Sequence, residues 1–143
     1  MELRWDTISG HEKQKEALRT MLREGRLPHA LLFTGPDGIG KRMVGRVLAA
    51  AILCDAEDGP CGHCESCRAM QLGSHPDYLE VVPEQNGKSA AQIRIEAIRS
   101  MQTQVSRYPV LAKRRTVLID DADRMNEAAQ NSLLKTLESR KVL

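Results

Sequence analysis

The chain of 143 residues is long enough for about one domain, and its 21 basic and 19 acidic residues leave a net charge of +2. Such a small charge does not by itself indicate a nucleic-acid-binding protein, and an aromatic content of 3% argues against a stacking platform for single strands. No apolar run reaches membrane-spanning length and "MELRWDTISG" lacks the apolar segment of a signal peptide, so we expect a cytoplasmic protein with no membrane partner.

The first part of the chain predicts a helix, a strand, a glycine-rich loop and a second helix, in that order. Residues 11–24 place apolar side chains on one helical face, and Gly25 follows as a helix stop. The apolar run 30–33 within "PHALLFTG" predicts a buried strand. After the glycine-rich loop, apolar residues recur at helical spacing over residues 44–51.

The glycine-rich stretch "GPDGIGKR", residues 35–42, resembles a phosphate-binding loop. A loop between a strand and a helix supports that interpretation, because the helix N-terminus points unpaired amides at an anion. At its last position the loop normally carries Ser or Thr, whose hydroxyl ligates Mg²⁺, but Arg42 offers no oxygen to a metal. The predicted phosphate-contacting residues are Gly35, Gly38, Gly40, Lys41 and Arg42.

The second part of the chain alternates strands and helices. "YLEVV" predicts a strand over residues 78–82, and the stretch after Ser89 predicts a helix that ends at Pro109. "RTVLIDDAD" predicts a third strand, and "NEAAQNSLLKTLE" a last helix. This alternation predicts an α/β fold with a parallel sheet and crossover helices.

The third predicted strand runs into acidic residues, and Asp120 stands at its carboxyl end. A phosphate loop needs a carboxylate there to hold Mg²⁺, so Asp120 is the predicted partner of the loop. The next residue in ATPases of this type is usually Glu, which orients the attacking water, whereas this chain has the shorter Asp121. The alternative is that these acidic residues only solvate a loop.

All four cysteines fall within residues 54–67, with the spacing Cys54-x₆-Cys61-x₂-Cys64-x₂-Cys67. Four thiolates in this register can close a tetrahedral shell, so we predict a structural Zn²⁺ module at about residues 54–67. An iron–sulfur cluster and free or redox-active cysteines are the alternatives. His63 could replace one thiolate, whereas His11, His29 and His75 are interpreted as structural.

The phosphate loop, the four-cysteine insertion, "LIDDADRMN" and "NSLLKTLE" occur here in an order that closely resembles the N-terminal AAA+ domain of bacterial DNA polymerase III clamp-loader subunits. The resemblance covers essentially the whole chain and implies an AAA+ P-loop NTPase-type fold with a zinc-binding insertion. The gamma/tau ATPase subunits of this family are expected to have Thr and Glu where this chain has Arg42 and Asp121. Both departures fit the delta-prime branch, which in many bacteria does not hydrolyse ATP.

The resemblance also implies partners and a function. A delta-prime-like subunit would act with gamma/tau and delta subunits to load the sliding clamp onto primer–template DNA, with ATP or ADP binding left open. The family's DNA-facing helix corresponds to the one after Ser89, where Arg94 is the candidate for contacts with DNA phosphates and Arg99 points to another face. The alternative for Arg94 is a solvated helix face.

Two other functions remain open on the sequence alone. One is an ATP-hydrolysing gamma/tau-type subunit, and the other is an autonomous P-loop nucleotide enzyme. In the resembled family, two further strands, a lid and a collar follow "LLKTLE". Residues 1–143 are therefore interpreted as the N-terminal part of an AAA+ P-loop domain, truncated before its last strands.

Overall fold

The computed structural model describes residues 2–35, 40–88 and 90–139. The chain divides into two compact units, one formed by Met1–Tyr78 with Pro109–Thr116 and the other by Leu79–Tyr108 with Val117–Leu143. In the described ranges, no helix is both long enough and apolar enough to cross a bilayer.

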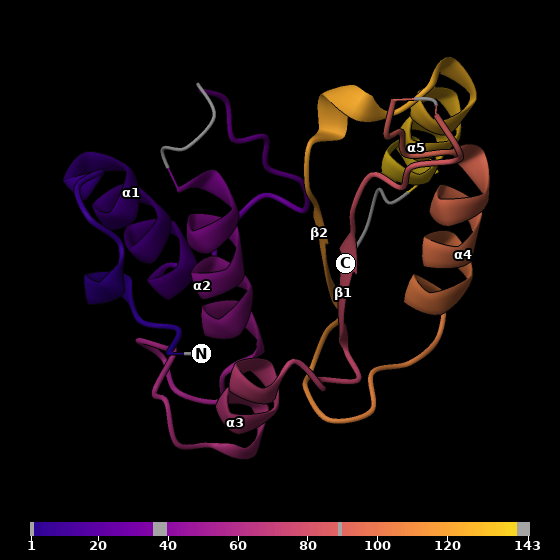
Figure 1. Ribbon diagram of the computed structural model, residues 1–143. Helices are drawn as coiled ribbons and strands as arrows, with labels where there is room; N and C mark the ends of the chain where they lie inside the picture. The colour runs from indigo at the N-terminus through magenta and orange to yellow at the C-terminus, as the bar shows by residue number, and fades with distance from the viewer. Residues whose placement is uncertain (1, 36–39, 89, 140–143) are drawn as a thin grey trace. The chain divides into compact units, whose positions relative to one another are not determined.

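The first unit is helical. It contains the 3₁₀ turn η1 (Trp5–Thr7) and the helices α1 (Glu12–Arg23), α2 (Lys41–Leu53) and α3 (Glu65–Leu72). Figure 1 shows α1 beside α2 within this unit, with α3 next to the C-terminal end of α2. The unit has one hydrophobic core, whose buried members are Leu3, Trp5, Ile8, Leu18, Val44, Val47, Leu48, Ala49, Ala50, Ala51, Leu53 and Met70.

Helix α1 ends as the sequence predicts. Gly25 adopts a left-handed backbone with φ +68°, which glycine accepts at little cost. Its N–H bonds the carbonyl of Leu22 at 3.3 Å, and the N–H of Arg26 bonds that of Met21 at 2.8 Å. These two bonds form a Schellman motif that satisfies the last carbonyls of the helix.

The predicted buried strand over residues 30–33 is wrong. Residues 30–34 form no strand, and the side chains of Leu31 and Leu32 are 42% and 77% exposed. Only Phe33 of this run packs against the core of the unit. A strand needs a neighbour to take its backbone hydrogen bonds, and within the described ranges none pairs with this segment.

The second unit carries the sheet, whose strands start at the boundary between the units. Strands β1 (Tyr78–Val81) and β2 (Thr116–Ile119) pair in parallel. The N–H of Thr116 bonds the carbonyl of Asp77, and the N–H of Asp120 bonds that of Val81, both at 2.9 Å. Along the chain, α4 (Ile95–Val105) comes between the strands, while the 3₁₀ turn η2 (Ala122–Arg124) and α5 (Glu127–Ser139) follow β2. The prediction of a mixed α/β chain with a parallel sheet is confirmed at this level.

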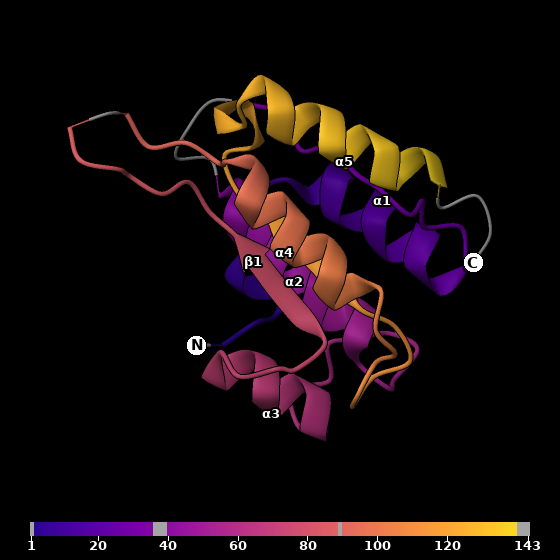
Figure 2. The same cartoon turned by 90° about the vertical axis from the view of Figure 1, so that its right-hand side faces the viewer.

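Helices α4 and α5 pack side by side, as Figure 2 shows. The amide of Gln102 on α4 donates to both the carbonyl and the hydroxyl oxygen of Ser132 on α5, each at 3.0 Å. The apolar core beneath them contains Val81, Ile93, Ile98, Met101 and Ala129.

Helix α4 begins later and ends earlier than the sequence predicts. Arg94 precedes its first turn as the N-cap residue, with extended φ and ψ of −94° and 164°. The residues before it pair instead, in the bridges Glu84–Gln92 and Ile93–Met125. These long-range backbone bonds hold residues 92 and 93 outside the helix, which corrects the prediction that Arg94 lies within its first turns. The helix stops at Val105, before Pro109.

Candidate metal centre and phosphate loop

The four cysteines come together at the junction of α2 and α3. Cys54 is the C-cap residue of α2, Cys64 is the N-cap residue of α3, and Cys67 lies in the first turn of α3. Cys61 lies in the loop between the two helices. The Sγ of Cys64 accepts a hydrogen bond from the N–H of Cys67 at 3.4 Å, so this cysteine also caps the helix.

The sulfur geometry fits a tetrahedral metal ion. All four Sγ atoms lie within 4.8 Å of one another. Two Sγ pairs, Cys61–Cys67 and Cys54–Cys64, are 3.9 Å apart. Four thiolates at the usual Zn–S distance of about 2.3 Å would be separated by about 3.8 Å, the edge of such a tetrahedron. The predicted ligand set is therefore brought together by the fold.

Backbone amides surround these sulfurs. Cys54 Sγ accepts from the N–H groups of Ala56 and Cys61 at 3.4 Å each. Cys61 Sγ accepts from His63 at 3.5 Å and from Cys64 at 3.3 Å. Such N–H donors stabilise negatively charged sulfur, the form that binds metals.

The thiols differ in acidity. The pKa of Cys61 is lowered to about 6, mainly by the hydrogen bond from the N–H of His63. Burial opposes this shift, and the N–H of Cys64 adds to it. Burial raises the pKa of both Cys54 and Cys67. A bound cation would counter that effect of burial, because its positive charge favours the thiolate.

The histidines take no part in the cysteine cluster. Within the described residues, the metal-binding group consists of cysteines alone, and His63 approaches it through its backbone N–H. His75 is buried, and its Nδ1 accepts from the N–H of Asp77 at 3.0 Å. Nε2 therefore carries the proton and donates to Ser66 Oγ, 3.1 Å away. Burial lowers the pKa of His75, which favours this neutral form and supports the structural interpretation.

One buried ionisable group was missed by the sequence analysis. Asp77 is only 2% exposed, and its carboxylate accepts from the N–H groups of Val110, Leu111 and Ala112 at 2.6, 2.7 and 2.6 Å. Burial alone would raise the pKa of Asp77, but these three donors bring it below its usual range. An isolated aspartate before a strand carries no pattern that would indicate this role.

The predicted phosphate loop, residues 35–42, is described by the structure only at its two ends. Gly40 is the N-cap residue of α2 with φ +91°, a conformation that favours glycine. The Nζ of Lys41 donates to the carbonyl of Gly35 at 2.6 Å. Arg42 is exposed in the first turn of α2, whereas Gly38 lies outside the described residues.

The predicted acidic partner belongs to the other unit. Asp120 is half-buried and directly follows β2. Asp121 is exposed and is the N-cap residue of η2, with a left-handed φ of +51°. The pairing of Asp120 with the loop stays a prediction.

Arg94 has a role in its own unit. One guanidinium nitrogen donates to the carbonyl of Glu84 at 3.0 Å, which ties the start of α4 to the preceding bridge. Contact with DNA is not tested by this bond and stays a prediction.

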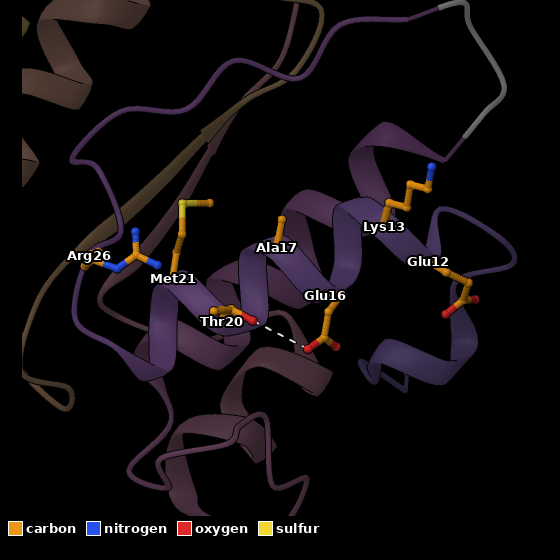
Figure 3. A pocket seen from close by; sticks show the side chains of 7 residues that line it. All are labelled: Glu12, Lys13, Glu16, Ala17, Thr20, Met21 and Arg26. Atoms are coloured by element: carbon orange, nitrogen blue, oxygen red, sulfur yellow. Dashed lines mark hydrogen bonds between the residues drawn. The ribbon is translucent and has the colours of Figure 1, made fainter.

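An open hollow on the surface of α1 is separate from these groups (Figure 3). On this surface, Thr20 Oγ1 donates a hydrogen bond of 3.5 Å to Glu16 Oε1. No metal-binding cluster of the described residues falls on it. It is lined by Glu12, Lys13, Glu16, Ala17, Thr20, Met21 and Arg26.

The fold and the site together define a class: a mixed α/β protein with a small parallel sheet and a four-cysteine cluster, consistent with the N-terminal domain of an AAA+ protein. The family model described as "DNA polymerase III, delta subunit" matches residues 10–141. This chain therefore belongs to that family.

Individual relatives agree with the family. The DNA polymerase III subunit delta′ of Pseudomonas aeruginosa is 41% identical over 112 residues, which cover 77% of this chain and 33% of the relative. Subunit delta′ of Escherichia coli is 36% identical over 125 residues, 86% of this chain and 36% of the relative. Subunit tau/gamma of Haemophilus influenzae is 33% identical over 133 residues, 92% of this chain and 18% of the relative. The chain thus spans about a third of the length of its delta′ relatives.

Proposed function

We propose that this chain is the N-terminal AAA+ part of a delta-prime-like subunit of the DNA polymerase III clamp loader. In that role it would help load the sliding clamp onto primed DNA during replication in the bacterial cytoplasm. The observation that carries the proposal is its 36–41% identity to delta′ subunits over 77–86% of the chain. Lid and collar domains would follow residue 143 in the complete subunit.

The metal proposed for the cysteine cluster is Zn²⁺ in a structural role. Four thiolates complete a tetrahedral shell and leave no position for a substrate, which separates such a site from a catalytic one. Protein purified without added metal should contain about one zinc per chain by elemental analysis. A disulfide among the four cysteines, or the absence of metal, would contradict this assignment.

The proposed subunit does not hydrolyse ATP. Hydrolysis needs a metal that bridges the β- and γ-phosphates, and Arg42 replaces the hydroxyl that would anchor it. Asp121, one methylene shorter than the usual Glu, would hold the attacking water poorly, and a misplacement of about 1 Å can cost about a hundredfold in rate. The amides at the start of α2 and the ammonium of Lys41 still suit an anion, so weak ATP or ADP binding is compatible with this proposal.

An ATP-hydrolysing gamma/tau-type subunit is the second candidate, supported by the 33% identity to a tau/gamma subunit over 92% of the chain. Steady-state ATP hydrolysis should separate the two, measured on full-length protein with its partners beside an Arg42→Thr, Asp121→Glu double variant. We expect no turnover that depends on Lys41 in the wild type. Turnover abolished by Lys41→Ala and equal to that of tau/gamma would favour the second candidate. Rapid turnover by the isolated protein would favour an autonomous P-loop enzyme.

The proposed partners are the tau/gamma and delta subunits, the sliding clamp and primer–template DNA. Full-length protein mixed with tau/gamma and delta should elute as one complex in size-exclusion chromatography and should support clamp loading. A protein that stays separate from both subunits would contradict the proposal. For DNA, Arg94 is the proposed phosphate contact, so Arg94→Ala should weaken binding of the assembled complex to DNA of any sequence.

A further inference from the structure

The loop of residues 55–60 joins Cys54 to Cys61. Hydrogen bonds and an ion pair connect this loop to the N-terminal part of the chain. The indole Nε1 of Trp5 donates a buried hydrogen bond of 3.0 Å to the carbonyl of Gly59. On α1, a guanidinium nitrogen of Arg19 bonds both carboxylate oxygens of Asp58, at 3.2 and 3.1 Å. The same guanidinium lies over the Trp5 ring, 5.9 Å from its centroid, where a cation is attracted to the aromatic face.

The position of this loop determines where the first metal-binding sulfur lies. A Cβ added at Gly59 would come within 2.8 Å of Cys54 Cβ and 3.0 Å of its Sγ, so the backbone of the loop lies directly against this ligand. Two loop amides, those of Ala56 and Cys61, also donate to Cys54 Sγ. A displaced loop would move both the ligand and the groups that stabilise its charge.

We propose that Trp5 and Arg19 are positioning residues of the metal centre. They hold the loop of residues 55–60 in the conformation in which Cys54 and Cys61 meet the other two cysteines. Because coupling between two binding events is reciprocal, the metal in turn holds Trp5 and the turn η1 in place. This inference rests on the metal assignment proposed above, and it adds residues outside the cysteine motif that determine how tightly zinc is kept.

The test measures zinc release from reduced, zinc-loaded full-length protein with a competing chelator and a colorimetric zinc indicator. Asp58→Asn removes the ion pair with Arg19 and the longer one, of 3.9 Å, with Arg23 on α1, and it touches no buried apolar group. Asp55→Asn makes the same chemical change in the same loop, at an exposed residue with no ion pair to α1 among those described. Trp5→Phe removes the indole donor.

We expect zinc release to be about three- to fivefold faster in Asp58→Asn, which corresponds to the usual contribution of a partly exposed ion pair. Trp5→Phe should release zinc up to about tenfold faster than the wild type. Loss of a group that orients a metal ligand typically weakens metal binding by about 10- to 100-fold, and we expect the lower end of that range. Asp55→Asn should match the wild type, and Asp58→Glu, which keeps the carboxylate, should recover most of the slow release. Recovery by Asp58→Glu would distinguish positioning from a general loss of stability.

The outcomes separate this inference from the metal proposal. Protein without zinc would overturn both. If the protein contains zinc but all the variants release it as slowly as Asp55→Asn, only the proposed roles of Trp5 and Arg19 are overturned. The reciprocal effect is measured by fluorescence, because the chain has a single tryptophan. Zinc removal should shift its emission to longer wavelengths, and an unchanged spectrum would overturn the coupling.

Discussion

The carboxylate of Asp77 offers the sharpest test of how the first unit is held together. It is almost fully buried and accepts three backbone N–H groups, with Val110 on one oxygen and Leu111 and Ala112 on the other. Asp77→Asn keeps the size of the side chain but leaves only one oxygen to accept. In its better orientation the amide retains two bonds and turns its NH₂ group toward the third donor.

The expected loss follows from these contacts. One buried N–H is left without an acceptor, which costs about 1–3 kcal/mol, and the two remaining bonds lose the strength of a charged acceptor. We therefore expect Asp77→Asn to lower the free energy of unfolding by about 2–4 kcal/mol. Urea unfolding followed by circular dichroism at pH 7 measures this, with Asp55→Asn as the exposed control. A difference between the two variants below about 0.5 kcal/mol, the usual scale of surface substitutions, would refute this account of Asp77.

The pH dependence of the same variant has a definite sign. The pKa of Asp77 is lowered by folding, so its carboxylate stabilises the protein fully above its unfolded pKa of about 3.9. That contribution is lost as the pH falls through the lower, folded pKa. The stability difference between the wild type and Asp77→Asn should thus be constant near neutral pH and shrink below about pH 4. A difference that grew on acidification would contradict the direction of the shift.

Three further substitutions have expected outcomes. Gly59→Ala should weaken zinc binding by about tenfold or more in chelator competition, since the added methyl would overlap Cys54. Lys15→Met should lower the free energy of unfolding by about 1–2 kcal/mol in urea, because Nζ of Lys15 is buried and donates to the carbonyl of Ile8 at 2.9 Å. Gln102→Ala should lower the free energy of unfolding by about 1 kcal/mol in the same assay, because its three bonds to α5 are lost.

The sequence predicts best those elements whose pattern is local. The helices α1, α2 and α5 follow from apolar periodicity and from residues such as Gly25, whose backbone requirement is set within one turn. The cysteine cluster follows from spacing alone, since metal ligands must converge on one point. In each case the physical cause lies within a few residues of the pattern.

The sequence-based predictions are wrong or incomplete where the local structure depends on residues far away in the sequence. Residues 30–33 have the composition of a strand but no partner among the described residues, and Arg94 is kept out of α4 by bridges that join separate parts of the chain. Helix α3 was missed because its N-cap is Cys64, a residue interpreted as a ligand, although Gly73 marks its end. The role of Asp77 depends on a loop more than thirty residues away, and no sequence pattern encodes such a contact.

Under the proposed function, the described ends of the predicted phosphate loop account for how the features that bind an anion could persist without ATP hydrolysis. Gly40 is required by its φ of +91° at the start of α2, and the bond from Lys41 to the carbonyl of Gly35 stabilises the loop itself. Helix α2 is also the most buried helix of its unit, and its buried residues begin at Val44. Arg42 and Asp121, by contrast, are exposed and occupy positions where the family's chemistry, rather than the packing of the core, selects the residue. Loss of catalysis would therefore alter these two positions first and leave the glycines and the lysine in place.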